Sequence, residues 1–323
     1  MIKKLFTFLF ASIISVVALA QDFDPASKSI EIVCAYPPGG ASDKVARVIE
    51  QIMTKNGWKA HVINKPGADT VIAANYAAKA AADGYTLYMG GNGFLDSNIA
   101  FKNKAPGIEY TESSFVPVMP MGISTLVLAV PGNSPINTYE DLVKYVKANP
   151  NKFNVGFWNQ YIGNLFKLWA KLENLPQPTI VNYKGSAPQM VDLMGGNLEF
   201  AFDTFVSTKQ PWQTNKIKII ATLTKEGEYL VRKTNPKANV TVLGARHPEL
   251  DMNIWYGLYA PAGTDAKVIN KINSVINKAL ADQSYAEQLL ASEIINSGGS
   301  VEKLRGIQTK TLNIMRTVSR ELE

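Results

Sequence analysis

The residues whose types and spacing best suit chemistry lie at positions 36–43, which read Tyr-Pro-Pro-Gly-Gly-Ala-Ser-Asp. An apolar run at 30–35 precedes them, and apolar residues at helical spacing follow from Val45, so the segment predicts a turn from a strand into a helix. The prolines end the strand, the glycines let the backbone lie close to a ligand, and Ser42 or Asp43 can cap the helix. Because free N–H groups at a helix N-terminus attract negative charge, this turn is suited to hold a small anion, although many such turns only connect two elements.

Three other segments offer donors of the same kind. They are residues 90–94 after a predicted strand, residues 157–164, and residues 184–186. One helix N-terminus contributes about 0.3–1 kcal/mol to a bound charge, or ~2 kcal/mol when the charge is partly buried. A ligand bound with micromolar affinity needs roughly 8 kcal/mol. Several loops must therefore converge on the ligand and exclude water by closing over it.

Motifs of catalysis and metal binding are scarce in this sequence. It has two histidines and one cysteine, without zinc-site spacing. It also lacks a Gly-x-Ser-x-Gly elbow, a phosphate-binding loop and a dinucleotide fingerprint after the first strand. We therefore expect no enzyme activity, no metal and no cofactor, although the members of a catalytic triad can lie far apart in sequence. Cys34 lies in an apolar strand pattern and is expected to be a buried, inert thiol.

The elements that must position these loops alternate between strands and helices. Strands are predicted at 58–64 and 85–89 with a helix at about 71–82 between them, the pattern of parallel crossovers in an α/β sheet. Ligands of such sheets bind beyond the carboxyl ends of the strands. The apolar runs 115–130 and 251–260 are long enough to cross from one domain to another and back. We therefore predict a hinged clamp of two mainly parallel sheets flanked by helices and joined by two crossing strands.

Two domains follow from these crossings. Domain I is predicted to comprise residues 21–125 and 255–323, and domain II residues 126–254. Within domain II, Ser186 and Gln189 have the spacing of a capping box. Asp203 stands at the carboxyl end of a strand, where it could receive a donor from a ligand or cap the next element.

Residues 1–20 predict a cleavable secretory signal. Lys3 and Lys4 precede an almost uncharged apolar run that closes with small residues, and cleavage is expected after Ala20. No later stretch is apolar over the length of a membrane span, so we expect a soluble, exported mature chain. After cleavage removes Lys3 and Lys4, the mature chain has 31 Lys and Arg against 27 Asp and Glu, a net charge of +4. This small and dispersed excess argues against nucleic acid as a partner.

Several motifs in this order resemble the extracytoplasmic solute receptors of tripartite tricarboxylate transporters, also called Bug-type receptors. The motifs are Tyr36–Asp43 with Arg47, Asn64–Ala68, Asp83–Leu87, Tyr183–Pro188, Phe202–Asp203 and Trp255–Thr264. The resemblance covers nearly the whole mature chain and implies a periplasmic-binding-protein clamp. Such a clamp closes on a small carboxylate and delivers it to a large and a small membrane subunit, without catalysis. The resemblance also implies that the loops at Pro38–Asp43 and Lys184–Ser186 grip a ligand carboxylate, and that Asp203 contacts the distal part of the ligand.

One segment departs from the pattern of that family. Where the family usually has a loop rich in Gly, Ser and Thr, residues 157–164 read Phe-Trp-Asn-Gln-Tyr-Ile-Gly-Asn. Large side chains replace the family's hydroxyl donors in this segment. The backbone N–H groups of Gly163 and Asn164 could still donate to a carboxylate. Trp158 and Tyr161 are expected either to pack in the core or to narrow the pocket and stack on a flat or apolar ligand.

Together these arguments define a set of candidate ligand-binding residues on both domains. They are Tyr36, Pro38, Gly39, Gly40, Ala41, Ser42, Asp43, Asn92, Gly93, Trp158, Asn159, Tyr161, Gly163, Asn164, Lys184, Gly185, Ser186 and Asp203. We expect Asp203→Ala or bulk at Gly40 to weaken ligand binding with little loss of fold. The expected protein is a monomeric periplasmic receptor; the alternatives are an exported enzyme acting on a small carboxylate and a ligand-binding module that feeds a membrane sensor.

Overall fold

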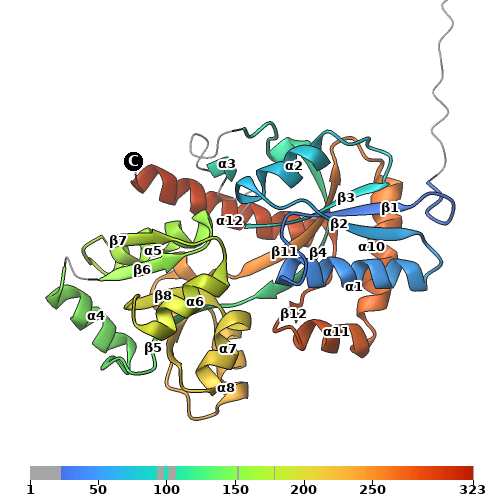
Figure 1. Cartoon of the computed structure of the whole chain (residues 1–323). Helices are drawn as coiled ribbons and strands as arrows, with labels where there is room; N and C mark the ends of the chain where they lie inside the picture. The colour runs from blue at the N-terminus through green and yellow to red at the C-terminus, as the bar shows by residue number, and fades with distance from the viewer. Residues whose placement is uncertain (1–22, 93–97, 101–106, 151–152, 178, 323) are drawn as a thin grey trace, which may run out of the picture.

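The computed structural model describes residues 23–92, 98–100, 107–150, 153–177 and 179–322. It places them in two β-sheets flanked by helices, as the sequence predicted (Figure 1). Among the helices of these described ranges, none is both long enough and apolar enough to cross a membrane.

The first sheet contains the strands nearest the two ends of the described chain, in the order β12-β4-β11-β3-β1-β2. β1 pairs in parallel with β2 and β3, whereas β11 runs antiparallel to β3 and β4. The strands are β1 (Ile30–Cys34), β2 (Ala60–Asn64), β3 (Thr86–Gly91), β4 (Phe115–Ser124), β11 (Ile254–Pro261) and β12 (Ile295–Asn296). The helices of this first lobe are α1 (Ala41–Lys55), α2 (Val71–Ala78), α3 (Asn98–Ala100), α10 (Ala266–Leu280), α11 (Gln283–Leu290) and α12 (Val301–Leu322).

The second sheet is built from the middle of the chain, in the order β10-β9-β5-β8-β6-β7. β6 pairs in parallel with β7 and β8, and β5 runs antiparallel to β8 and β9. The strands are β5 (Leu126–Pro131), β6 (Asn154–Phe157), β7 (Thr179–Asn182), β8 (Phe200–Thr204), β9 (Ile217–Thr222) and β10 (Thr241–Val242). The helices of this second lobe are α4 (Tyr139–Ala148), α5 (Gln160–Leu172), α6 (Ser186–Gly195), α7 (Phe205–Gln213), α8 (Lys225–Thr234) and α9 (Leu243–Arg246).

The chain passes between the lobes twice. β4 ends at Ser124 and β5 begins at Leu126, so the buried Thr125 alone separates strands of different sheets. The return passage lies between Val242 at the end of β10 and Ile254 at the start of β11. The apolar run at 115–130 is therefore two strands, because each half finds its hydrogen-bonding partners in a different sheet.

The apolar face of α1 fixes the position of the turn that precedes it. Val45, Val48, Ile49 and Ile52 recur at helical spacing and are at most 2% exposed. Burial of one such side chain contributes about 1.5–3 kcal/mol. β1 and α1 are thus held antiparallel to each other, and the turn between them lies at the side of the first lobe that faces the second (Figure 1).

Two predicted boundaries in the first lobe are wrong. α2 ends at Ala78 rather than near residue 82. β3 continues through Gly90 and Gly91, which the sequence pattern had assigned to a loop. A Cβ atom at Gly91 would lie 2.5 Å from the carbonyl oxygen of Trp255, so this glycine permits the close pairing of β3 with β11.

Candidate ligand-binding site

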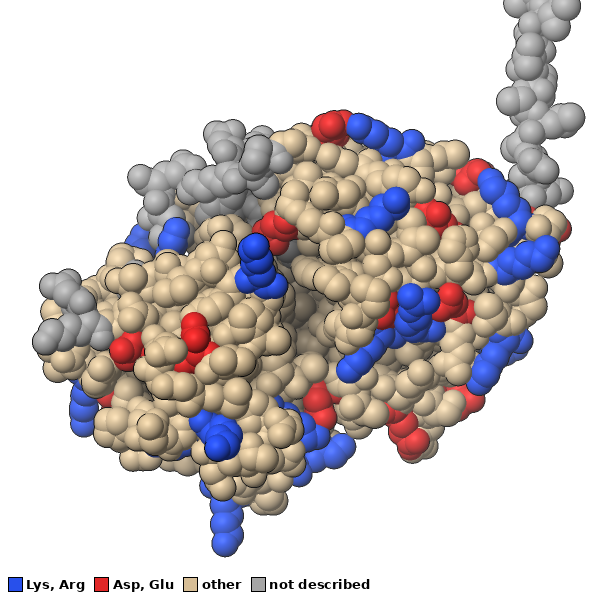
Figure 2. Space-filling model, in the orientation of Figure 1, with Lys and Arg blue, Asp and Glu red and all other residues tan. Residues whose placement is uncertain are grey.

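A hollow separates the two lobes, and charged side chains of both signs stand around its mouth (Figure 2). The turn from β1 into α1 lies where the lobes meet, and α6 of the second lobe lies across from it (Figure 1). Several of the loops that were predicted from the sequence to bind a ligand follow the carboxyl ends of parallel strands in the two sheets. The candidate site is thus built from both lobes, as expected for a ligand held between two sheets.

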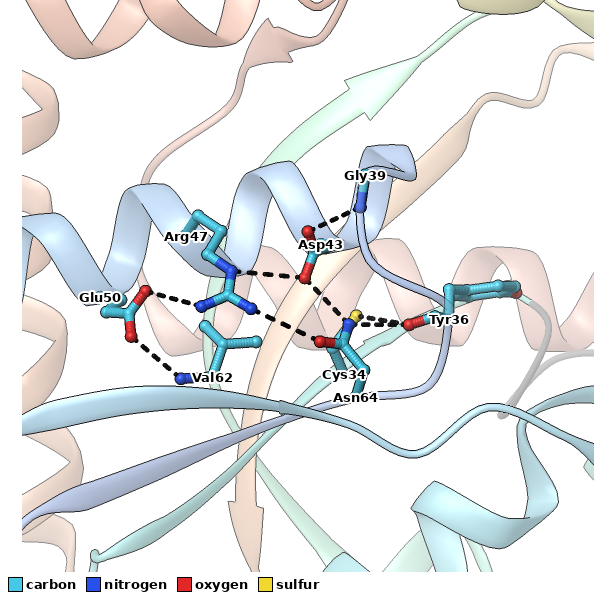
Figure 3. Close-up of polar contacts among 8 residues, drawn as sticks. All are labelled: Cys34, Tyr36, Gly39, Asp43, Arg47, Glu50, Val62 and Asn64. Atoms are coloured by element: carbon cyan, nitrogen blue, oxygen red, sulfur yellow. Dashed lines mark hydrogen bonds and ion pairs between the residues drawn. The ribbon is translucent and has the colours of Figure 1, made fainter.

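A network of side chains holds the turn at 36–43 (Figure 3). Oδ2 of Asp43 accepts the N–H of Gly39 at 2.9 Å, and its Oδ1 accepts Nδ2 of Asn64 at 2.9 Å. The same nitrogen of Asn64 donates to the carbonyl oxygen of Tyr36 at 2.8 Å. Nε of Arg47 lies 3.5 Å from Oδ1 of Asp43. These contacts fix the turn without using the first amides of α1.

The N-terminus of α1 is left without a side-chain cap. Gly40 is the N-cap residue and α1 begins at Ala41, so the prediction that Ser42 or Asp43 caps the helix is wrong. Both residues lie inside the first turn, where Asp43 reaches back to the preceding loop instead. The first N–H groups of a helix have no acceptor within it, so the amides of Ala41, Ser42 and Asp43 are the donors that this turn can offer. Residues 38–40 beside them are exposed.

The N-terminus of α6 repeats this arrangement on the second lobe. Gly185 is its N-cap residue, with φ of 136°, and no side chain caps the helix. Ser186 and Ala187 supply the free amides, since Pro188 has no N–H. Lys184 beside them is exposed. A side chain caps each of the helices α4, α5, α8, α10 and α11, whereas α2, α7 and α9 also begin without a side-chain cap.

The predicted capping box of Ser186 and Gln189 is wrong, because both side chains bind elsewhere. The hydroxyl of Ser186 donates to Oδ2 of Asp203 at 2.5 Å. Nε2 of Gln189 donates to the carbonyl oxygen of Phe202 at 3.1 Å and to Oδ2 of Asp203 at 3.3 Å. The start of α6 is thereby tied to the end of β8.

Asp203 is the centre of the polar contacts in the second lobe. It is fully buried, and its carboxylate also accepts Nε1 of Trp158 at 3.2 Å and the N–H of Thr204 at 2.6 Å. Burial raises the pKa of Asp203 to about 6, although hydrogen bonds from Ser186 and its other donors oppose the rise. Because both oxygens hold neighbouring donors, the expectation that Asp203→Ala spares the fold needs revision. Its removal leaves several buried donors without an acceptor.

Residues 157–164 do not form the predicted loop. α5 begins at Gln160, and Asn159 is its N-cap residue, whose side-chain oxygen accepts an N–H of the first turn at 2.9 Å. The N–H of Gly163 donates to the carbonyl oxygen of Asn159 at 3.2 Å, so it is not free for a ligand. Asn164 lies one residue deeper in the helix and is 1% exposed. The expected backbone donors of this segment are therefore used by α5 itself.

The aromatic residues of the candidate set divide between core and cleft. Tyr161 is 1% exposed and packs in the hydrophobic core, so it is not available to stack on a ligand. Tyr36 and Trp158 are partly exposed, and each adjoins a turn that leads to a helix N-terminus. These two side chains are the aromatic groups of the set that can contact a ligand.

Asn92 clamps two strands of the first lobe. Its Nδ2 donates to the carbonyl oxygen of Asn253 at 3.1 Å, and its Oδ1 accepts the N–H of Trp255 at 2.8 Å. The side chain is 2% exposed and holds the end of β3 against the start of β11. Gly93, the neighbouring candidate, lies outside the described residues.

Two residues of the site region were absent from the predicted set. Asn64 orders the turn at 36–43, and its place at the end of β2 was a signal that sequence reasoning could have used. Burial raises the pKa of Asp69, and the backbone of Gln160, at the start of α5 in the other lobe, opposes the rise. No sequence pattern announces this contact, because it depends on how the two lobes meet. In the described part of the chain, no group of His, Cys, Asp and Glu is placed to hold a metal ion.

Two α/β lobes, joined by two passages of the chain and enclosing a hollow, define the class of periplasmic binding proteins. Solved structures agree with this fold. A protein described as a periplasmic transporter superposes with a TM-score of 0.77 at 27% identity, covering 92% of this chain and 98% of that one. MatC from Rhodopseudomonas palustris, solved with bound malate, superposes with a TM-score of 0.76 at 23% identity, covering 90% and 98%.

Sequence comparison then gives the family. The sequence model of the tripartite tricarboxylate transporter family receptor matches residues 45–316. Protein BugT of Bordetella pertussis is 28% identical over 309 residues, which cover 94% of this chain and 91% of BugT. A UPF0065 protein of Agrobacterium vitis, from the TAR-I ttuE-ttuC' intergenic region, is 31% identical over 289 residues, which cover 87% of this chain and 79% of that protein. The chain belongs to the tripartite tricarboxylate transporter receptor family.

Proposed function

We propose that this protein is a periplasmic receptor that captures a small organic carboxylate between its two lobes. The observation that carries the proposal is the position of two uncapped helix N-termini, that of α1 on one lobe and that of α6 across from it on the other (Figure 1). Both begin at turns that buried aspartates hold in shape. Free amides at a helix N-terminus favour a carboxylate, and two such termini contribute up to about 4 kcal/mol, so other contacts in the closed cleft supply the rest of the roughly 8 kcal/mol that micromolar binding needs.

The known ligands of structural relatives support the chemical class. MatC was solved with malate, and another R. palustris protein of this fold was solved with adipate. Both ligands are small organic acids. The proposal takes the two lobes as the predicted domains, 21–125 with 255–323 and 126–254, which close on the ligand.

A binding role is favoured over catalysis by the surroundings of the candidate loops. Ser42 and Ser186 are the hydroxyls of these loops, and neither has a histidine partner among the described residues. His61 lies 3.0 Å from the hydroxyl of Ser29, and His247 bonds to a glutamate at 2.8 Å. The loops therefore offer donors for a bound anion rather than a nucleophile with its base.

The proposal includes export and a membrane partner. Residues 1–20 act as the signal, with cleavage after Ala20, and the mature monomer delivers its ligand to the large and small subunits of a tripartite transporter. Family membership supports this partner. Deletion of the gene should abolish uptake of the ligand by cells, and a complemented strain should recover it.

The decisive experiment identifies the ligand. Native mass spectrometry of the mature chain 21–323, followed by a thermal-shift screen of organic acids, should find at least one acid that stabilises the protein. At 100 times its Kd, such a ligand adds about 2.7 kcal/mol to the free energy of unfolding. If no acid stabilises the chain, the proposal fails. If the protein converts the bound acid to a product, the protein is an exported enzyme rather than a receptor.

A further inference from the structure

Three neighbouring strands of the second sheet bring Trp158, Asp203 and the start of α6 to one edge. β6 lies between β8 and β7 and is parallel to both, so their carboxyl ends lie at the same edge of the sheet. Gly156 of β6 is in register with Ala201 of β8. Trp158 and Asp203, each two residues further along the chain, therefore lie side by side. The turn into α6 follows β7, so all three features lie at the edge where ligands of such sheets bind.

One buried carboxylate holds the indole and the α6 turn together. Oδ1 of Asp203 accepts Nε1 of Trp158 at 3.2 Å, while its Oδ2 accepts the hydroxyl of Ser186 at 2.5 Å. The indole is thus fixed beside the first amides of α6, which the proposed function assigns to the ligand carboxylate. Because α6 lies across from the turn of the first lobe (Figure 1), the ring is placed next to the body of a ligand held between the lobes.

The donors around Asp203 are already used by its carboxylate. The indole N–H, the hydroxyl of Ser186, Nε2 of Gln189 and the N–H of Thr204 all donate to it. Asp203 and Gln189 are fully buried. Trp158 and Ser186 are partly exposed, so they are the members of this group that a ligand can touch. Since its N–H is occupied, the indole offers a ligand its apolar ring surface rather than a hydrogen bond.

The segment that carries Trp158 adds no hydroxyl donor to the cleft. Residues 157–164 contain neither Ser nor Thr, and Tyr161 is buried in the core. The N–H of Gly163 and the side-chain oxygen of Asn159 are used within α5. From this part of the second lobe, a ligand therefore meets helix amides and a flat apolar ring.

We propose that Trp158 is a specificity-determining residue of the cleft, and that it selects carboxylates whose body is a flat aromatic group. This inference rests on the proposed carboxylate receptor and narrows its substrate class. The ligand ring packs against the indole while its carboxylate meets the amides of α6, so the two rings gain an aromatic contact in addition to burying apolar area. A more polar acid would lose water from a hydroxyl or second carboxyl group against the indole, without a hydrogen bond in return.

Two substitutions separate the ring from its hydrogen bond. Trp158→Phe and Trp158→Leu both lose the N–H that Asp203 accepts, but only Trp158→Phe keeps an aromatic ring. A difference between these two variants therefore reports on the ring, and thermal unfolding checks that both are folded. Trp212→Phe is the matched control. Trp212 is another partly exposed tryptophan of the second lobe, near the end of α7 that is remote from β8, and its ring packs edge-on against Phe205.

The test is calorimetric titration with benzoate and phenylacetate, each beside its cyclohexyl analogue, and with malate and 4-aminobutyrate. The members of each ring pair have the same number of carbon atoms and one carboxylate, but only one ring is flat. The wild type and Trp212→Phe should bind an aromatic acid about threefold or more tightly than its cyclohexyl analogue, and about tenfold or more tightly than malate. Trp158→Phe should keep an aromatic preference of about twofold or more, whereas Trp158→Leu should bring the ratio to about one.

The remaining outcomes contradict the role of Trp158. Binding of malate, 4-aminobutyrate or another non-aromatic acid more tightly than either aromatic probe overturns it, while the carboxylate receptor stands. An aromatic preference that Trp158→Leu retains, or that Trp158→Phe and Trp158→Leu lose to the same extent, also overturns it, because the ring is then not the selecting group. If no probe binds the wild type and the screen of organic acids is also negative, the receptor proposal fails and this inference fails with it.

Discussion

The hydroxyl of Ser186 and the carboxylate of Asp203, 17 residues apart in the chain, form a hydrogen bond of 2.5 Å. Trp158 reaches the other oxygen of the same carboxylate at 3.2 Å. One buried acid thus holds the turns before α5 and α6 together. Asp43 has the corresponding role in the first lobe, where it accepts the N–H of Gly39. Each lobe presents its candidate binding turn on a framework that a buried aspartate organises.

Asp203→Ala should therefore weaken both binding and folding. The turn that bears the free amides of α6 loses its anchor, so the Kd of the ligand should rise by about tenfold or more. Buried donors left without an acceptor should lower the free energy of unfolding by about 3 kcal/mol. Urea denaturation and calorimetric titration measure the two effects. Glu226→Ala, which removes an exposed acid of the second lobe, should change neither.

The raised pKa of Asp203 gives a pH dependence of defined sign. Burial places this pKa at about 6, above its ordinary 3.8, so the folded protein holds a proton that the unfolded chain has released between these values. Its contribution to stability is present below pH 3.8 and is lost as the pH rises through 6. The free energy of unfolding of the wild type, relative to Asp203→Asn, should thus fall by up to about 3 kcal/mol from pH 4 to pH 7. A difference that is constant or rises with pH contradicts this assignment.

Gly40→Leu should weaken binding with a small effect on folding. Gly40 has an ordinary φ of −71°, and an added Cβ would lie 3.5 Å from the carbonyl oxygen of Pro37, a normal contact. The larger side chain would stand beside the free amides of α1, so Kd should rise by about tenfold or more. Loss of the glycine N-cap should cost about 1 kcal/mol of folding free energy. Gly306→Leu, on the exposed side of α12, is the control and should leave Kd unchanged.

The sequence predicted those parts of the fold that depend on local pattern. The apolar spacing from Val45 predicted α1. The apolar run at 115–130 marked one passage between sheets, whereas the run at 251–260 is mostly β11 of the first sheet, just after the return passage. These features are encoded within a few residues, so they can be read without knowing the tertiary contacts.

The parts of the site that were mispredicted depend on distant partners. Ser186 looked like a helix cap, but a carboxylate 17 residues away takes its hydroxyl. Asn92 looked like a loop donor, although its amide binds Asn253 just before β11 and Trp255 within it, both more than 160 residues away. Asp69 gave no signal at all, since its contact with α5 exists only when the lobes come together. Local patterns cannot show such competition among long-range acceptors.

Glu173 should stabilise the second lobe without affecting the ligand. Its side chain is 7% exposed and accepts hydrogen bonds from Tyr139 and His247, each at 2.8 Å, and Nε of Arg246 lies 3.2 Å away. Burial alone would raise its pKa, but these bonds and the charge of Arg246 hold the pKa below its usual range. Glu173→Gln should lower the free energy of unfolding by about 1–3 kcal/mol at neutral pH.

This loss should shrink as the pH falls below the ordinary pKa of a glutamate, because a depressed pKa stabilises only while the group is ionised. Glu140→Gln removes an exposed partner of Arg246, 3.7 Å away, and serves as the control with little expected effect. A pH-independent loss in Glu173→Gln would mean that its packing, rather than its charge, matters.

Glu293→Gln should loosen the contact between the lobes. Nζ of Lys209 on α7 lies 2.5 Å from Oε1 of Glu293, which follows α11 of the first lobe. The pair borders a pocket of about 490 Å³ between α7, α8 and α11. Because both side chains are partly shielded, the ion pair should contribute up to about 1 kcal/mol to the arrangement of the lobes in this structure; if the ligand binds this arrangement, loss of the pair should raise Kd by up to about fivefold. Small-angle scattering should show a larger radius of gyration for the ligand-free variant. Glu228→Gln, which breaks an ion pair with Arg232 inside α8, should leave both quantities unchanged, and 1 M salt should bring the wild type toward Glu293→Gln.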